Sequence, residues 1–294
     1  MRNALEHLPQ RSRFAVLRLR SLGDCVLTTP ALEILKQCRP DLRIGVVVEN
    51  RFAPVFEGNP CVDEILPPSL RILAAWRPDL CLNLHGGTRS LLLTAASGAR
   101  LRAGFAHFRG KLAYNVRIPR AQETLGVERK VHTAEHLASA MFFLGAQRIQ
   151  IPRAQLYAEN AAASSPYAVL HPIASAADKT WPAEGFLTVG RFLRENGGLE
   201  PVFIAGPGED LAPFAEFRTI IGAPLAETKT LLKGAALFIG NDSGPAHMAA
   251  AFGVPVVVLF GNSDPIVWAP WQVECEVLTG DSVRSIQPDQ VIRA

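Results

Sequence analysis

The sequence predicts an α/β protein made of two Rossmann-like, doubly wound domains that face each other across a cleft. Short, continuous apolar runs alternate with helical patterns from end to end, which is typical of parallel sheets covered by helices on both faces. The length of 294 residues corresponds to about two domains. We place the domains at 1–150 and 151–294, because residues 147–166 have weak periodicity, two prolines and an Ala/Ser run typical of a linker.

In the first half, three apolar runs predict buried strands, at Phe14–Leu19, Ile44–Val48 and Leu80–Leu84. The first helical pattern covers Cys25–Cys38, with apolar residues at positions 27, 31, 34 and 35 on one face. A second covers Ser90–Ser97. A third carries His132 and His136 near one face and ends at Gly145, a residue that commonly stops helices.

The second half shows the same alternation of strands and helices. Its predicted strands are Tyr167–His171, Pro201–Ala205, Leu237–Gly240 and Val254–Phe260. Helical patterns cover Ala183–Glu195 and Pro245–Phe252. Ligands of doubly wound sheets bind at the carboxyl ends of the strands, so the loops that follow these strands are where functional side chains are expected.

The charge is divided unevenly between the halves. The whole chain has 30 Lys and Arg against 27 Asp and Glu, but residues 1–160 carry a net charge of +9 and residues 161–294 one of −6. Such a division favours two domains with different partners. Most of the basic residues are Arg, whose forked guanidinium suits carboxylates and phosphates.

Several classes of protein are disfavoured. The chain has no apolar run near the ~18 residues of a membrane span and no signal-peptide core at its start, so we expect a cytoplasmic protein without a transmembrane segment. Neither a GxGxxG nor a GxxxxGK[ST] motif occurs, which disfavours dinucleotide enzymes and P-loop NTPases. The five scattered cysteines form no CxxC pair, and we expect mostly reduced core residues and no metal site. A nucleic-acid-binding module is not recognisable either.

Two segments have the position and chemistry of a site. Residues 21–24 (SLGD) follow the first strand, which places Asp24 at the sheet's carboxyl edge, although position alone favours a simple helix cap. Residues 240–247 (GNDSGPAH) join a strand to a helix whose first backbone N–H groups could hold a phosphate, with His247 one turn further on. The alternative there is an ordinary cap beside a core histidine. Lys179 and Glu209 follow two strands of the second half and could contact a diphosphate and a ribose.

Residues 132–136 (HTAEH) match the H-x-x-E-H pattern of some zinc proteases. The doubly wound context and the lack of a third ligand helix disfavour zinc. A helix that faces the cleft or packs in the core is the preferred interpretation.

In order and spacing, these segments resemble the ADP-heptose:lipopolysaccharide heptosyltransferases, glycosyltransferase family 9. The resemblance covers most of residues 14–270 and is carried by residues 18–66, 79–105, 171–186 (HPIASAADKTWPAEGF) and 240–261 (GNDSGPAHMAAAFGVPVVVLFG). It implies a GT-B fold, with the acceptor bound by the N-terminal domain and the nucleotide-sugar by the C-terminal one. It also implies an inverting transfer that needs neither metal nor cofactor. Asn83 and His85 depart from the Asp and Gln that relatives commonly show.

The resemblance assigns roles residue by residue. Asp24 matches the proposed general base and Lys179 the lysine that contacts the donor phosphates. The matching donor-binding positions are Ser175, Glu209, Asp242, Ser243, Gly244 and His247. Candidates for binding an anionic acceptor, suggested by the basic first half, are Arg18, Arg20, Arg51, Arg89 and His132.

The expected function is therefore transfer of heptose from ADP-heptose to a hydroxyl of the lipopolysaccharide inner core. The partners would be this donor and an anionic glycolipid at the inner face of the inner membrane. Two alternatives stay open: a family member with another nucleotide-sugar or acceptor, and a non-catalytic nucleotide-binding or scaffold protein.

Overall fold

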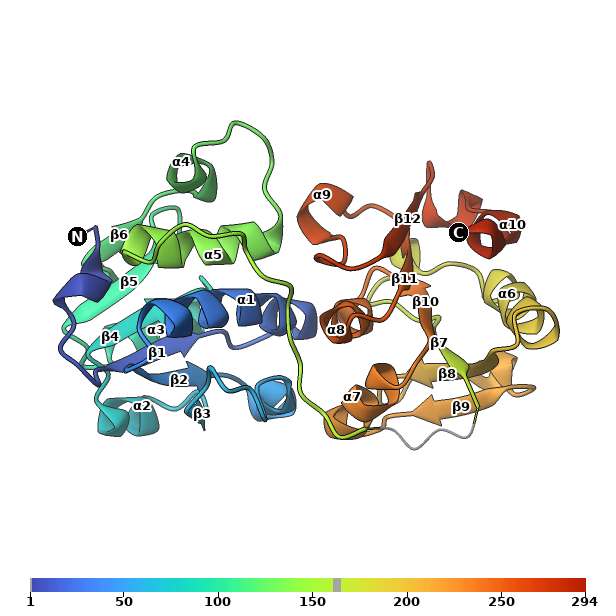
Figure 1. Cartoon of the computed structure of the whole chain (residues 1–294), viewed down its shortest axis with the longest axis horizontal. Helices are drawn as coiled ribbons and strands as arrows, with labels where there is room; N and C mark the ends of the chain where they lie inside the picture. Colours follow the sequence, from blue (N-terminus) through green and yellow to red (C-terminus); the bar gives the residue numbers. More distant parts are fainter. Residues whose placement is uncertain (1, 161–164) are drawn as a thin grey trace. The chain divides into compact units, whose positions relative to one another are not determined.

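The computed structural model describes residues 2–160 and 165–294, and the chain divides into two compact units, Met1–Tyr157 and Ala158–Ala294. Within the described residues, each unit holds one six-stranded sheet in which all strands are parallel (Figure 1). The predicted α/β class is thereby confirmed. Of the expected linker, residues 147–160 contain no helix or strand, and residues 161–164 lie outside the described residues.

The N-terminal sheet has the strand order β3-β2-β1-β4-β5-β6. Its strands are β1 (Arg13–Leu17), β2 (Arg43–Val47), β3 (Glu64–Leu66), β4 (Leu80–Asn83), β5 (Leu101–Phe105) and β6 (Val116–Ile118). The three predicted strands are β1, β2 and β4, whose residues are almost all buried. The sequence analysis did not find β3 and β6, which have three residues each and include a charged one, or β5, whose apolar run is interrupted by Arg102.

Helices cover this sheet. They are α1 (Leu22–Cys38), α2 (Leu70–Trp76), α3 (Thr88–Ala95), α4 (Ala121–Leu125) and α5 (Thr133–Leu144). Helix α1 begins directly after β1 and packs against α5, which lies beside it in Figure 1. Eleven residues of α1 are buried, so this helix is a central part of the unit rather than an outer cover. The predicted end of α5 at Gly145 is confirmed.

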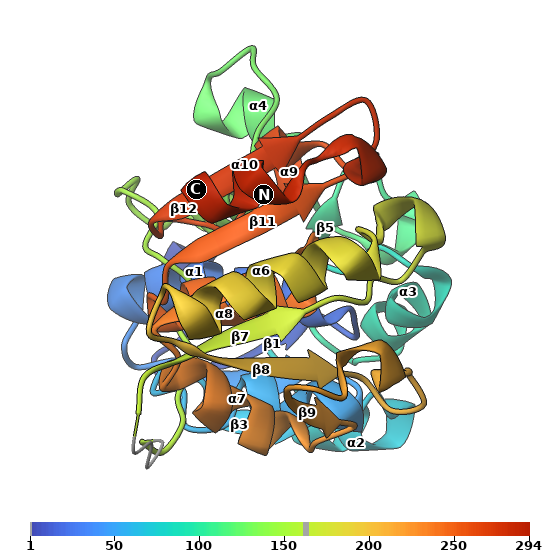
Figure 2. The ribbon, with the colours of Figure 1, turned by 90° about the vertical axis from the view of Figure 1, so that its right-hand side faces the viewer.

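The C-terminal sheet has the order β12-β11-β10-β7-β8-β9, which is the same winding. Its strands are β7 (Tyr167–His171), β8 (Glu200–Ala205), β9 (Arg218–Ile221), β10 (Leu237–Asn241), β11 (Val256–Phe260) and β12 (Cys275–Thr279). Its helices are α6 (Ala183–Glu195), α7 (Leu225–Lys233), α8 (Gly244–Phe252), α9 (Pro265–Trp268) and α10 (Pro288–Arg293). Helix α6 lies against β7 and β8, as Figure 2 shows, over a core that includes Trp181, Phe186 and Phe203.

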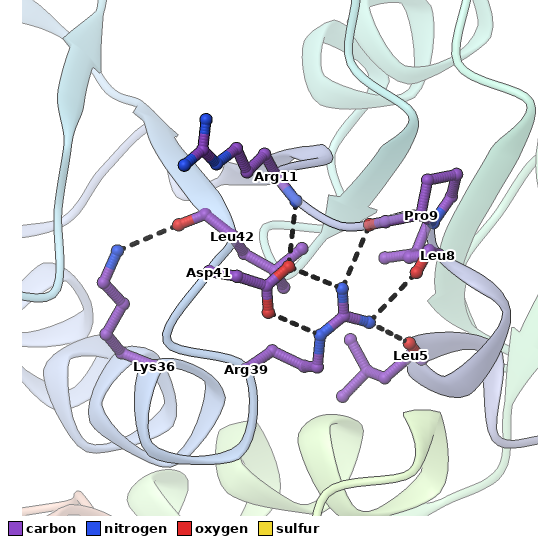
Figure 3. A network of polar contacts seen from close by, with 8 residues as sticks. All are labelled: Leu5, Leu8, Pro9, Arg11, Lys36, Arg39, Asp41 and Leu42. Atoms are coloured by element: carbon purple, nitrogen blue, oxygen red, sulfur yellow. Dashed lines mark hydrogen bonds and ion pairs between the residues drawn. The ribbon is translucent and has the colours of Figure 1, made fainter.

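Arg39, at the end of α1, ties the N-terminal segment to the first unit (Figure 3). Its guanidinium donates hydrogen bonds to the backbone carbonyls of Leu5, Leu8 and Pro9. It also forms a forked pair with Asp41, at 2.7 Å from Nε and 2.8 Å from Nη2. The backbone N–H of Arg11 donates to the same carboxylate at 2.9 Å. The Arg39 guanidinium therefore satisfies three backbone carbonyls of the N-terminal segment. Its partner Asp41 also accepts from Arg11, so the pair links this segment to the end of α1.

We expect Asp41 to make the stability of this unit depend on pH. The hydrogen bond from Arg39 holds the pKa of the Asp41 carboxyl well below its ordinary value. Such a carboxyl stabilises the fold above its unfolded pKa of about 3.9, and this contribution is lost as pH falls through the lower folded pKa. Asp41→Asn should therefore flatten the acid limb of stability below about pH 4 and cost roughly 1 kcal/mol at neutral pH.

Urea unfolding followed from about pH 7 down to about pH 2 measures this effect. Glu128→Gln, a change at an exposed residue of the same unit, is the matched control and should leave the acid limb unchanged. An acid limb as steep in Asp41→Asn as in the unsubstituted chain would contradict the prediction.

Candidate active site

Both sheets reverse their winding at one place, between β1 and β4 in the N-terminal unit and between β7 and β10 in the C-terminal unit. In doubly wound sheets, ligands bind beyond the carboxyl ends of the strands at this switch point. Arg18 and Asp24 follow β1. Lys179 follows β7, and Asp242 follows β10. The structure thus places these sequence-predicted residues at the two switch points, each in its own unit.

Asp24 lies in the first turn of α1, and its carboxylate is held from two sides. Its Oδ1 is 3.3 Å from Nη1 of Arg18, and its Oδ2 accepts a hydrogen bond from Ser21 Oγ at 3.1 Å. The Arg18 side chain is 6% exposed, whereas that of Asp24 is 23% exposed. The N-cap position of α1 is taken by Ser21, so Asp24 is not the cap of this helix. It is an oriented, partly accessible carboxylate beside a buried cation.

Two of the predicted acceptor-binding residues form ion pairs with one carboxylate, that of Glu49, which the sequence analysis did not identify. Glu49 follows β2, and its carboxylate pairs with Arg51 at 3.1 Å and with Arg89 at 3.3 Å. Both arginine side chains are more than half exposed. Arg20 is also exposed, whereas Arg18 is buried as the partner of Asp24. The only sequence signal for Glu49 was its position after an apolar strand.

The structure shows His132 in a capping position. Its Nδ1 accepts a hydrogen bond from the Ala134 backbone at 3.1 Å at the start of α5, and Glu135 reaches back to the His132 backbone at 2.8 Å. Glu135 also pairs with Arg129 at 2.6 Å. In the described part of the chain, no cluster of three or more His, Cys, Asp or Glu could hold a metal ion. A role of His132 in acceptor binding stays a prediction.

In the C-terminal unit, the structure joins Lys179 to Asp242. Lys179 Nζ is 3.7 Å from Asp242 Oδ2, with the two side chains 32% and 12% exposed. The loop that carries Lys179 is fixed by the buried Asn241, which accepts from the Trp181 backbone and donates to the Pro172 carbonyl, both at 2.9 Å. Neighbouring strands β7 and β10 therefore present a lysine and a carboxylate at one point of the sheet edge.

Helix α8 begins beside this pair. Ser243 is its N-cap residue and Pro245 lies in its first turn, where a missing N–H costs nothing. Ser243 Oγ is 3.2 Å from Nδ1 of His171, and burial lowers the pKa of His171 to about 4, so that this ring is neutral at pH 7. The first-turn N–H groups of a helix have no intrahelical acceptors and favour anions. Next to Lys179, this helix start suits a phosphate group.

The remaining donor candidates are less closely joined. Glu209 accepts a hydrogen bond from the Gly206 backbone at 2.6 Å within the turn after β8, and no ion pair or hydrogen bond links it to Lys179 within the described residues. Ser175 lies on the exposed loop after β7, which lines a surface pocket of about 530 Å³ with the start of α6 and Arg284. His247 is buried, at 5% exposure, in α8.

The cysteines differ among themselves. Cys25 and Cys81 are buried free thiols, and burial raises the pKa of each to about 12, which makes them poor nucleophiles. Cys38, by contrast, is exposed, so the expectation of core residues does not hold for it. In the part of the chain that the structure describes, no helix is both long enough and apolar enough to span a bilayer.

Two doubly wound units with charged loops at both switch points define the architecture of a GT-B glycosyltransferase. The model of glycosyltransferase family 9 (heptosyltransferase) matches residues 70–291, and the chain belongs to this family. The resemblance found in the sequence is thereby confirmed, as is the expectation of an enzyme of this class.

Individual proteins agree with this assignment. The chain is 27% identical over 291 residues to lipopolysaccharide heptosyltransferase 3 of Escherichia coli K12, covering 86% of this chain and 83% of the relative. A family 9 glycosyltransferase from Veillonella parvula has the same fold, with a TM-score of 0.86 at 23% identity over 97% of this chain and 96% of its own. An E. coli heptosyltransferase solved with ADP-2-deoxy-2-fluoro heptose gives a TM-score of 0.77 at 20% identity, over 96% and 98% of the two chains.

Proposed function

We propose that this protein transfers heptose from ADP-heptose to a hydroxyl group of the lipopolysaccharide inner core, with inversion at the anomeric carbon. The observation that carries the proposal is the pairing of Lys179 with Asp242 beside the start of α8. This arrangement offers a cation and helix N–H groups to a diphosphate. A relative of the same fold binds an ADP-heptose analogue, which supports this choice of donor.

In this proposal, the C-terminal domain, expected at 151–294, binds the donor. Lys179 turns from Asp242 to the diphosphate, while Asp242 keeps the lysine oriented before the donor arrives. Gly244 and Ser243 contribute the helix start. Glu209, with one carboxylate oxygen held by Gly206, has lone pairs left for ribose hydroxyls. Ser175 and His247 complete the proposed contacts with the nucleotide.

The N-terminal domain, expected at 1–150, binds the acceptor. Asp24 takes the proton of the attacking hydroxyl as its oxygen forms a bond to the anomeric carbon and the bond to the β-phosphate oxygen breaks. Lys179 and the start of α8 stabilise the charge that develops on the departing ADP. In this division of work, Lys179 and the N–H groups at the start of α8 supply the positive charge that a metal ion would otherwise offer to the leaving group.

The acceptor is an anionic glycolipid, so the proposed place of action is the inner face of the inner membrane. The net charge of +9 on residues 1–160 supports this, as do the exposed Arg20, Arg51 and Arg89 at the carboxyl edge of the N-terminal sheet. Because Arg51 and Arg89 share Glu49, the acceptor would compete with that carboxylate for both guanidinium groups.

Donor binding can be tested by thermal unfolding with a panel of nucleotide-sugars. ADP-heptose at about one hundred times its Kd should stabilise the folded protein by about 2.7 kcal/mol, while UDP- and GDP-sugars should give no shift. Stabilisation by one of those sugars instead would replace the donor in the proposal. Stabilisation by ADP-heptose without transfer to any inner-core acceptor would favour a non-catalytic nucleotide-binding protein.

A further inference from the structure

Four exposed aliphatic side chains lie on one face of the N-terminal unit. Trp76 of α2 and Leu93 of α3 belong to one buried cluster, so both helices cover the same side of the sheet, as Figure 2 shows. Within the described residues, the large aliphatic side chains that this unit exposes are Leu70, Ile72, Leu92, Leu112 and Ile149. The first three lie on α2 and α3, and Leu112 lies in the loop after β5. We call residues 70–77, 88–96 and 108–113 the α2–α3 face.

Leu112 is the most exposed of these side chains, at 94%, and the backbone that carries it is held on both sides. The Ala113 N–H donates to the Gly110 carbonyl at 3.0 Å, and the Ala113 carbonyl accepts from Nε of Arg102 at 2.9 Å. Tyr114, the next residue, is only 3% exposed and anchors the turn in the core. The exposure of Leu112 therefore follows from a fixed backbone and not from a loose loop.

The turn that carries Leu112 lies against α3. Residues 111–113 pack on this helix, and a Cβ atom at Gly110 would clash with the side chain of Leu91. At the start of α3, Nη2 of Arg89 donates to the carbonyl of Pro68 at 3.3 Å, two residues before α2 begins. These contacts join α2, α3 and the turn into one continuous surface.

The charge of this part of the chain is almost entirely positive. Residues 67–122 hold nine Lys and Arg and a single acidic residue, Asp79. Asp79 lies at the amino edge of the sheet, where its carboxylate accepts from the Arg13 backbone at 2.9 Å. The exposed arginines on and beside the α2–α3 face are Arg71, Arg77, Arg89, Arg100 and Arg109. In the described part of the chain, Arg89 alone among these five has a carboxylate partner, Glu49 at 3.3 Å.

Apolar side chains beside cationic ones are the combination that binds an anionic bilayer. Leucine and isoleucine side chains gain from leaving water at the acyl boundary, and guanidinium groups are attracted to anionic lipids. A protein partner would have to bury several arginines, which is costly unless it supplies matching carboxylates. We propose that the α2–α3 face docks the protein on an anionic phospholipid bilayer, with Leu92 and Leu112 in the headgroup region.

Docking by this face is linked to the proposed function through Arg89. This residue lies on the α2–α3 face and also pairs with Glu49, which follows β2 at the carboxyl edge of the sheet where Asp24 lies. A bilayer on the α2–α3 face is therefore close to the loops proposed to bind a glycolipid acceptor. The purpose of docking rests on that proposed function, whereas binding to phospholipid needs neither substrate.

Flotation with large unilamellar vesicles tests the docking directly. We expect vesicles with about one quarter phosphatidylglycerol in phosphatidylethanolamine to bind the protein at least about 10-fold more strongly than vesicles of phosphatidylcholine. Binding should weaken as the ionic strength rises from about 0.01 M to about 0.15 M, because the screening length falls from about 30 Å to about 8 Å. A protein that does not bind the anionic vesicles, or binds both kinds equally, overturns the proposal.

The apolar part of the contact is tested by Leu112→Ser. Because this side chain is 94% exposed, its loss removes no packing in the folded protein. We expect the partition coefficient on anionic vesicles to fall about 10-fold. Ile149→Ser is the matched control and should bind as the unsubstituted chain does. Ile149 lies next to α4, since the Arg148 guanidinium donates to the Leu125 carbonyl at 3.4 Å. Equal losses in the two variants would contradict the docking face.

The charged part is tested by the double variant Arg100→Gln/Arg109→Gln, which leaves the proposed acceptor arginines intact. We expect it to bind anionic vesicles about 30-fold more weakly. Arg2→Gln/Arg153→Gln removes the same charge from exposed positions of the same unit that lie outside the α2–α3 face. If both double variants lose binding to the same extent, the net charge and not this face attracts the bilayer, and the proposal is wrong.

Leu112→Trp reports insertion without any transfer assay. Compared with the unsubstituted chain, its added emission should move to shorter wavelength with anionic vesicles, whereas that of Ile149→Trp should not. A dimer that Leu112→Ser dissociates, with vesicle binding unchanged, would make the face a contact between copies and overturn the proposal. The vesicles hold neither lipopolysaccharide nor ADP-heptose. Binding without heptose transfer therefore refutes only the proposed function, and transfer to a soluble acceptor without vesicle binding refutes only the docking.

Discussion

Asp24→Asn should lower kcat by about 10²- to 10⁴-fold while leaving the fold and the affinity for ADP-heptose unchanged. The amide has the shape of the carboxylate and can keep the contact with Ser21, but it cannot take a proton from the attacking hydroxyl. Arg18 would face a neutral partner in place of its counter-ion. Steady-state transfer assays with saturating donor measure the effect.

Asp281→Asn is the control for this variant, because Asp281 is exposed in a loop of the C-terminal unit. It should have the kcat of the unsubstituted chain. Thermal unfolding of both variants shows whether either substitution changes stability. If Asp24→Asn folds and retains near-normal turnover, Asp24 is not the base, and the proton must be taken by another group.

The second large effect is expected for Lys179→Ala. Removing the ammonium group takes away the charge that is proposed to meet the diphosphate, in the ground state and more strongly as ADP departs. We expect kcat to fall about 10²- to 10³-fold, with a weaker affinity for ADP-heptose. Asp242, 12% exposed, would also be left without its cation, which adds repulsion toward the donor phosphates.

Isothermal titration with ADP-heptose and with ADP, beside transfer assays, separates the two parts of this effect. Lys233→Ala serves as the matched control, since Lys233 is an exposed lysine of the same unit whose Nζ donates to the Ala158 carbonyl. Donor affinity that is equal in Lys179→Ala and Lys233→Ala would remove Lys179 from the donor site.

The strands that could be predicted are those at the centre of each sheet. Strands such as β1 and β11 are covered on both faces, so their sequences are continuous apolar runs that stand out from the surrounding pattern. Edge strands such as β9 and β12 are largely accessible and carry polar residues, which makes them similar to loops in sequence. Their place depends on pairing with β8 and β11, which is information from elsewhere in the chain.

The residues of the candidate site also differ in whether the sequence alone could predict them. Asp24, Lys179 and Asp242 were found because each follows a predicted strand and each matches a functional position of the family that the sequence resembles. Glu49 was not assigned a role, because a single polar residue after a strand has no distinctive local pattern. Its importance rests on a partner far away in the sequence, Arg89.

The sequence by itself thus determined the α/β class, the central strands, the family and the residues with the chemistry of a transferase. Only the tertiary structure decided which of these residues meet. Lys179 and Asp242 are 63 positions apart and come within 3.7 Å because β7 and β10 are neighbours at the switch point of their sheet. Periodicity and motifs report the local environment of a residue, whereas strand order is set by which apolar faces the whole chain can bury together, and that order places the charges.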